Sequence, residues 1–198
     1  MTLILDIDFD AFVNPVARNL EENGERLSDD QYNVDDRESI YSFLEENLFM
    51  KSWVNVAPLT NHIEVLGKIN AFIENGLLSP PFDWVHVDAH DDLYGHWDMP
   101  SNSGNFLYQL FLNEIIAKFT FVYRENAWDF PDYILNENED HTYRLEINGL
   151  VTPVEFGHVY EYVLPKQPDF IMLTQSPSFT PESIDEIYYE VVNRFEHK

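Results

Sequence analysis

The chain contains no cysteine, no long apolar run and few basic residues, and each lack excludes a class of protein. Without cysteine there is no disulfide framework and no catalytic thiolate. No apolar run is long enough to span a membrane, and Asp6, Asp8 and Asp10 interrupt the first apolar stretch. Neither a membrane helix nor a signal peptide is therefore predicted, and a cytoplasmic protein is expected.

Basic residues are scarce, with 11 against 36 acidic ones and a formal net charge of -25. A field of this sign repels nucleic acids and anionic membranes and attracts cations. We therefore expect no nucleic-acid partner and no membrane partner. A cationic substrate is compatible with the charge but not required by it, because acidic surfaces also keep proteins in solution.

Length and composition favour a single domain over residues 1–198, since 44% of the residues are hydrophobic and no repeat or linker divides the chain. Strands alternate with helices along most of the sequence, which predicts an α/β fold in three layers with a largely parallel sheet. A β-hairpin excursion is predicted where Tyr143–Ile147 and Val159–Leu164 flank Asn148-Gly149. The expected strands are Thr2–Phe9, Trp53–Ala57, Phe82–Asp88, Phe119–Tyr123 and Asp169–Leu173. Two helices are expected at Arg37–Met50 and Gly104–Lys118. A third helix is expected to be capped by Thr60 and to end near Gly76, and the last is expected to open at Thr180-Pro181.

Acidic residues gather where two of the expected buried strands end. Asp6 and Asp8 end the first strand, and Asp88, His90 and Asp92 lie at alternate positions where another strand ends. Alternate residues of an extended chain point the same way, and functional residues collect at the carboxyl ends of parallel strands. Converging carboxylates repel one another unless cations neutralise them. The pattern therefore predicts a site for divalent metal ions, although a single Asp-x-Asp more often caps a helix or faces solvent.

Three segments resemble the arginase/agmatinase (ureohydrolase) superfamily. Asp88-Ala89-His90-Asp91-Asp92 resembles its Asp-Ala-His-x-Asp signature, Leu5-Asp6-Ile7-Asp8 is similar to its Asp-x-Asp motif, and Asn61–Ile69 is similar to the segment that opens with its third metal-binding histidine. Here the Asp-x-Asp motif comes first, as if the sheet were circularly permuted. The order and the short chain resemble a compact branch that includes peptide arginases, which convert arginine to ornithine in ribosomally made peptides. The resemblance implies an arginase/deacetylase-like fold with permuted strand order.

The resemblance also implies a binuclear metal centre. One ion would be bound by His62 and Asp92 and the other by His90 and Asp8, with Asp6 and Asp88 bridging the two. A donor set rich in oxygen and free of sulfur favours Mn²⁺. A hydroxide bridging two such ions would attack the guanidinium carbon of an arginine side chain and release urea.

Further residues are candidates for catalysis and substrate binding. His96 is the candidate proton shuttle to the leaving amine, although an ordinary loop histidine is an equal alternative, and Asp91 is the second catalytic candidate. His86 is interpreted as structural or as supporting the ligands. In arginases an acidic residue binds the guanidinium group. The corresponding position here lies near Thr174 and Gln175, which are uncharged. This loss of an arginase contact would suit arginine presented within a precursor peptide. The substrate-binding candidates are Asp10, Ser176 and Glu182.

Other functions compete with this interpretation. The substrate could be a free guanidino compound such as arginine or agmatine. A strand ending in Asp6-x-Asp8 also resembles the haloacid-dehalogenase phosphatases. These enzymes need a lysine at a later strand end, and none of the five lysines of this chain is expected at such a position. A zinc deacylase would need paired catalytic histidines that are not evident. The last alternative is an acidic metal-binding protein without catalytic activity.

Overall fold

The computed structural model describes residues 1–17, 26–47, 55–94, 99–124, 134–135 and 143–196. Within this part of the chain, eight strands form one sheet in the order β4-β10-β1-β5-β6-β9-β8-β7. Six neighbouring strands are parallel, namely β4 (Asn55–Leu59), β10 (Phe170–Thr174), β1 (Leu3–Asp8), β5 (Phe82–Asp88), β6 (Ile116–Tyr123) and β9 (Leu150–His158). The sheet ends in two antiparallel strands, β8 (Tyr143–Ile147) and β7 (Ile134–Leu135).

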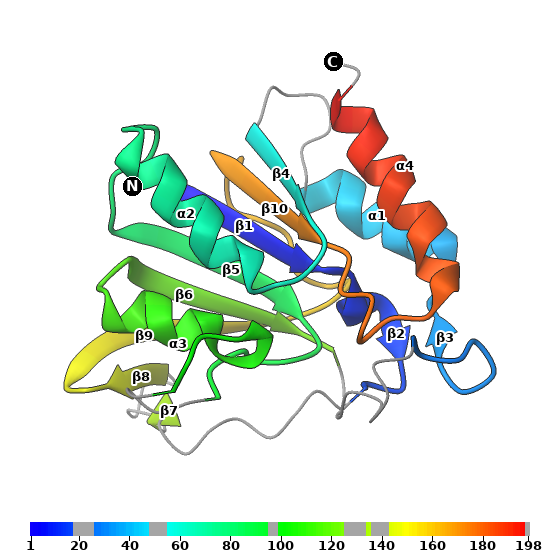
Figure 1. Cartoon of the computed structure of the whole chain (residues 1–198), viewed down its shortest axis with the longest axis horizontal. Helices are drawn as coiled ribbons and strands as arrows, with labels where there is room; N and C mark the ends of the chain where they lie inside the picture. The colour runs from blue at the N-terminus through cyan, green and yellow to red at the C-terminus, as the bar shows by residue number, and fades with distance from the viewer. Residues whose placement is uncertain (18–25, 48–54, 95–98, 125–133, 136–142, 197–198) are drawn as a thin grey trace.

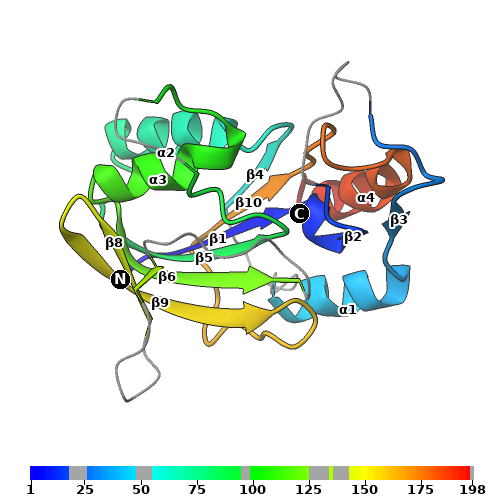
Figure 2. The same cartoon turned by 90° about the horizontal axis from the view of Figure 1, so that it is seen from below.

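Helices cover both faces of the sheet, so the three-layer α/β prediction is confirmed at this level (Figures 1 and 2). One face carries α1 (Arg37–Asn47) and α4 (Asp185–Glu196), and the other carries α2 (Glu64–Glu74) and α3 (Phe106–Leu112). Successive residues of β1 alternate between the two cores, with Leu5 in the first and Ile4 in the second. Because both faces of β1 are covered, its residues are apolar without interruption as far as Asp6.

Short elements connect these layers. A 3-10 turn, η1 (Phe9–Phe12), follows β1, and a two-stranded ribbon pairs β2 (Val13–Asn14) with β3 (Asn33–Val34). The turns η2 (Ser103–Asn105) and η3 (Glu182–Ile184) precede α3 and α4. None of the described helices is both long enough and apolar enough to cross a bilayer.

Several helix boundaries differ from the sequence-based expectation. The last helix, expected to open at Thr180-Pro181, starts as the turn η3 at Glu182 and becomes α4 at Asp185. The helix predicted to reach Lys118 ends at Leu112, because a turn at Glu114, where φ is 55°, reverses the chain into β6. Thr60 is not an N-cap, since α2 begins at Glu64. The Glu64 side chain instead accepts hydrogen bonds from the backbone N–H groups of Thr60 and Asn61 and closes the turn ahead of the helix.

The hairpin prediction is half right. Asn148 and Gly149 both have positive φ and join β8 to β9, as a two-residue turn requires. The partner strand is Leu150–His158, and the predicted Val159–Leu164 is not a strand. A two-residue turn brings the very next residues into register, so the correct partner had to follow Gly149 directly. The predicted strand residues Trp53 and Val54 and helix residues 48–50 lie outside the described part.

The strand order brings the two acidic runs together. β1 lies between β10 and β5, and all three run parallel, so their carboxyl ends share one edge of the sheet. The register pairs Asp6 with His86 and Asp8 with Thr174. Residues 80 or more positions apart in sequence are thereby neighbours.

Candidate metal centre

Asp88, the last residue of β5, lies at the centre of a buried cluster of carboxylates and imidazoles. Its Oδ2 atom lies 3.1 Å from Nδ1 of His62 and 3.2 Å from Nε2 of His86. Its Oδ1 atom accepts a hydrogen bond of 2.7 Å from the backbone N–H of His90 and lies 3.5 Å from the Nδ1 atom of that residue. The two oxygens of one carboxylate therefore face two different sets of side chains.

The first set surrounds His62, which lies in the turn before α2 and is 2% exposed. Its Nδ1 atom is 2.9 Å from Oδ2 of Asp8 and 3.0 Å from Oδ2 of Asp92, in addition to the contact with Asp88. Its Nε2 atom contacts Oδ1 of Asp6 at 3.1 Å. One nitrogen is thus anchored on a carboxylate, while the other faces three carboxylate oxygens.

The second set surrounds His90. The Nδ1 atom of this ring lies 2.9 Å from Oδ2 of Asp10, and its Nε2 atom donates a hydrogen bond of 2.6 Å to the carbonyl of Ala17. Asp10 is buried and also accepts a hydrogen bond from the backbone N–H of Ala89. An imidazole fixed by a backbone carbonyl through one nitrogen is oriented to present the other to a metal ion.

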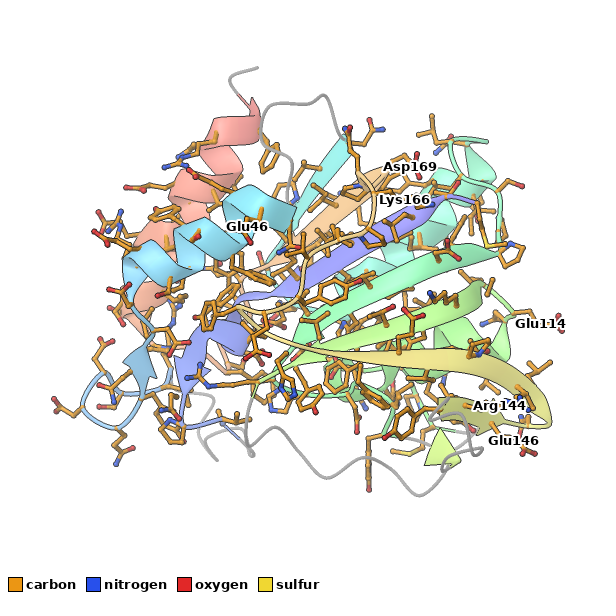
Figure 3. The ribbon with its side chains drawn as sticks, turned by 180° about the vertical axis from the view of Figure 1, so that it is seen from behind. Glu46, Glu114, Arg144, Glu146, Lys166 and Asp169 are labelled. Atoms are coloured by element: carbon orange, nitrogen blue, oxygen red, sulfur yellow. The ribbon has the colours of Figure 1, made fainter. Side chains whose placement is uncertain are left out.

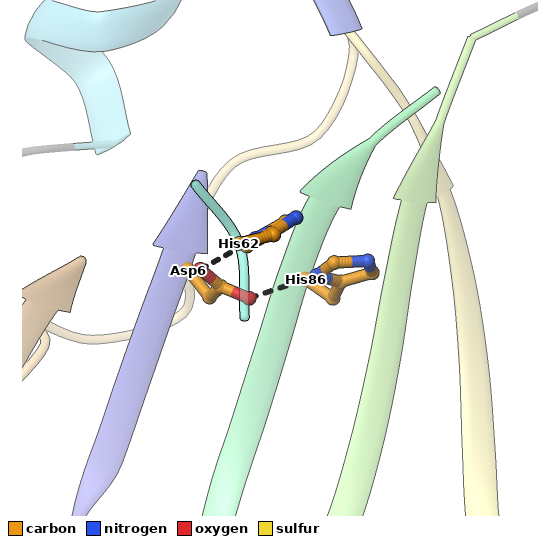
Figure 4. Close-up of side chains that lie close together, drawn as sticks. All are labelled: Asp6, His62 and His86. Atoms are coloured by element: carbon orange, nitrogen blue, oxygen red, sulfur yellow. Dashed lines mark hydrogen bonds and ion pairs between the residues drawn. The ribbon is translucent and has the colours of Figure 1, made fainter. Parts of the chain in front are cut away.

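Asp6 lies between two imidazole rings (Figure 4). Its Oδ1 atom contacts His62, and its Oδ2 atom accepts from Nδ1 of His86 at 3.0 Å. Apolar rings hold His86 in place, because Phe121 stacks on it with centroids 5.6 Å apart and Phe106 meets it edge-on at 5.9 Å. The carboxylate fixes the orientation of both histidines.

The structure brings together all six residues that the resemblance implied as ligands, but their neighbours differ from the implied division. Asp6 contacts imidazoles, whereas Asp10, expected at the substrate, is the carboxylate beside His90. Asp10 continues the spacing of Asp6 and Asp8, and the η1 turn folds it back so that its N–H donates to Asp8. That continued spacing was the signal that could have placed Asp10 in the cluster.

Three of the remaining candidate residues lie in the described part of the chain. Ser176 is buried and donates its hydroxyl hydrogen to Asp8. Asp91 is partly buried and accepts from the backbone N–H of Leu93, and Glu182 is exposed at the first residue of η3. Ser176 and Asp92 both have positive φ, 49° and 47°, a strained conformation that is common at functional sites. His96 lies outside the described residues.

Burial and mutual repulsion perturb the acids of the cluster. Burial, and then the charge of Asp88, raises the pKa of Asp92 to about 7. Burial, followed by the charges of Asp8 and Asp88, raises the pKa of Asp10 well above its ordinary value. For Asp88 the effect of burial is outweighed by the neighbouring histidines, chiefly His86, and its pKa lies well below the ordinary range.

The cluster fits divalent cations in donor chemistry and charge. Five buried carboxylates surround three imidazoles, so the cluster carries excess negative charge whenever all five acids are ionised. Oδ2 of Asp88 and Oδ2 of Asp92 are buried without a hydrogen-bond partner. Buried carboxylate oxygens that accept no hydrogen bond are costly unless a cation neutralises them. Four groups of three residues offer ligand atoms within 4.8 Å of one another, and Asp88 belongs to three of these groups.

The metal-free chain should lose stability as the pH rises from 6.5 towards 10. Burial alone would lower the pKa of His86, but Asp88 and Asp6 raise it to about 10, so its stabilising charge is complete below pH 6.5 and lost through pH 10. The pKa of Asp92, raised to about 7, lowers stability over the range from pH 3.8 to 7, so that loss is nearly complete where the loss from His86 begins. Bound cations displace these protons, so the rise in Tm caused by Mn²⁺ should grow over this range in thermal unfolding. A constant rise would contradict the assignment.

A pocket of about 460 Å³ adjoins the cluster. Ser176, in its wall, binds Asp8, and Phe179 packs against His90 with ring centroids 5.1 Å apart. The lining residues that the structure describes are uncharged, and they include Asn61, Asn102, Ser103, Ser176, Ser178 and Phe179. The size suits a side chain or small ligand.

In comparisons with known proteins, no family model, no curated protein and no solved structure matches the chain.

Proposed function

We propose that the chain is a hydrolase that uses two divalent metal ions to remove urea from arginine side chains within a peptide. One observation carries the binuclear part of this proposal. The two oxygens of Asp88 face two separate sets of imidazole and carboxylate groups, as a carboxylate shared between two ions would. The urea-releasing part rests on the resemblance of the motifs to those of the ureohydrolases.

The contacts suggest how the residues divide between the ions. His62, Asp8 and Asp92 would bind one ion and His90 and Asp10 the other, with Asp88 shared. This donor set of carboxylates and imidazoles suits Mn²⁺ and neighbouring first-row ions. When bound, the ions supply Lewis-acid activation of water. Asp6 then orients His62, and the Ala17 carbonyl orients His90, so that both rings keep one tautomer.

The neutral pocket supports a peptide substrate over free arginine. Free arginine carries an α-carboxylate, which is recognised best by a cationic side chain. The described lining offers amide and hydroxyl groups instead, which suit the main-chain amides of a peptide. The net charge of -25 favours approach of a cationic guanidinium.

A product assay tests the proposed reaction. The metal-loaded chain is incubated with an arginine-containing peptide, with free arginine and with agmatine, and urea and product masses are measured. We expect urea only from the peptide, with ornithine in place of arginine. Turnover of free arginine or agmatine alone would reassign the substrate, and absence of urea from all three would contradict guanidine hydrolysis.

Replacing His96 with alanine should leave ion binding intact and reduce the turnover rate by roughly 10²–10⁴-fold, the usual contribution of a general acid. Metal analysis and urea release measured on the same preparation check this. A variant that also loses metal would show that His96 has another role. The exposed His158, at the end of β9, provides a matched histidine-to-alanine control.

The lysines of the described part do not support phosphoryl transfer. Lys166 precedes β10 and lies at the amino edge of the sheet, near Asp169 (Figure 3). It contacts Asp83, in the first half of β5, at 3.7 Å. Lys118 pairs with Glu155, and Lys68 is exposed on α2. None of the three follows a strand at the edge where the acids converge.

A further inference from the structure

His86 has a nitrogen without a hydrogen-bond partner inside the cluster. Five buried side-chain atoms in the described part have no such partner, and three of them belong to His86 (Nε2), Asp88 (Oδ2) and Asp92 (Oδ2). These three residues offer ligand atoms that lie within 4.8 Å of one another. Orphaned polar atoms are rare in protein interiors, and their convergence on one place indicates a missing common partner.

The other nitrogen of His86 is firmly anchored. Nδ1 lies 3.0 Å from Oδ2 of Asp6, and the ring is completely buried between Phe106 and Phe121. A carboxylate acceptor at Nδ1 keeps the proton on that atom and leaves the lone pair of the neutral ring on Nε2. A histidine that donates one N–H to a carboxylate and presents its other nitrogen to a cation is the common arrangement at metal sites.

We infer that Nε2 of His86 binds one of the two proposed ions directly, together with Asp88 and Asp92. The inference rests on the proposed binuclear centre and extends its ligand set. Asp6 is then a positioning residue, since it holds the N–H groups of both His62 and His86. The alternative is that Nε2 keeps its proton and His86 remains an imidazolium beside Asp88, 3.2 Å away, whereas an ion bound at Nε2 would displace that proton.

This ligand makes the two ion sites unequal. The ion near Asp92 gains two imidazoles, from His62 and His86, whereas the ion near Asp10 has only that of His90. Imidazole-rich sites favour Co²⁺ and Zn²⁺ over Mn²⁺ more strongly than carboxylate-rich sites do. The first equivalent of Co²⁺ should therefore enter the site of His62 and His86, and Mn²⁺ should compete less well there than at His90.

Nuclear magnetic resonance of the Co²⁺-loaded full chain tests the inference without an activity assay. Each histidine that binds paramagnetic Co²⁺ gives one strongly shifted signal from its remaining ring N–H. Those N–H groups have acceptors that protect them from exchange, namely Asp6 for His62 and His86 and the Ala17 carbonyl for His90. We expect three such signals in the wild-type protein.

The variant His86→Gln should show two of these signals, and its affinity for the first Co²⁺ should fall by at least about tenfold. His158→Gln, an exposed histidine, is the matched control and should retain all three signals. Two signals in the wild-type protein would overturn the inference and leave the binuclear centre standing, and this count needs no variant that could fail to fold. Absence of any Co²⁺ binding by the wild-type chain would overturn the proposed function itself.

Discussion

Replacing Asp88 with alanine should remove both bound ions from the chain and reduce urea release to background. Asp88 presents one oxygen to His62 and His86 and the other to His90, so its loss damages both sets of ligands at once. Removing a residue that only hydrogen-bonds to a metal ligand weakens metal binding by roughly 10–100-fold. Removing a ligand shared by two ions should weaken the binding of each ion by more than this. Metal analysis after equilibrium dialysis measures the effect.

Asp83→Ala is the matched control for this experiment. Asp83 lies on the same strand, near its beginning, where its side chain contacts Lys166 at 3.7 Å. It should retain both ions and full activity. An Asp88→Ala protein that still binds two ions would contradict the site, and one that keeps a single ion tightly would show that Asp88 serves only the other ion.

Removing the metal ions should lower the melting temperature by on the order of 10 °C. At free concentrations about 100 times the dissociation constant, each ion stabilises the folded state by roughly 2.7 kcal/mol, so two ions contribute about 5 kcal/mol. For chains of about 200 residues, each kcal/mol corresponds to about 2–4 °C. Calorimetry with Mn²⁺ and with a chelator measures the difference. The account would be contradicted by equal melting temperatures in the two conditions, and Asp88→Ala should show no difference.

The strands that build the site could be predicted because their apolar runs end abruptly in acids. Thr2–Phe9 and Phe82–Asp88 were predicted nearly to the residue, since strands buried on both faces leave a continuous apolar signal. The last part of the helix predicted at 104–118 failed because the β-branched pair Ile115-Ile116 follows a turn that the apolar spacing does not reveal.

The partners within the cluster could not be read from the sequence. Alternation along β5 places His86 and Asp88 on the same side, but only the register between strands places Asp6 opposite His86. Register depends on packing across the whole sheet. In the same way, Asp10 reaches His90 only because η1 reverses the chain after Asp8. Local spacing could identify the acids but not decide which histidine each one contacts.

The number of ions bound per chain tests the central claim most directly. Purified metal-free protein is dialysed against Mn²⁺ at several concentrations, and bound metal is measured against protein concentration. A shared Asp88 between two sets of ligands predicts saturation close to two ions per chain, with both lost in Asp88→Ala. No bound metal, or a single tightly bound zinc that excludes a second ion, would contradict it.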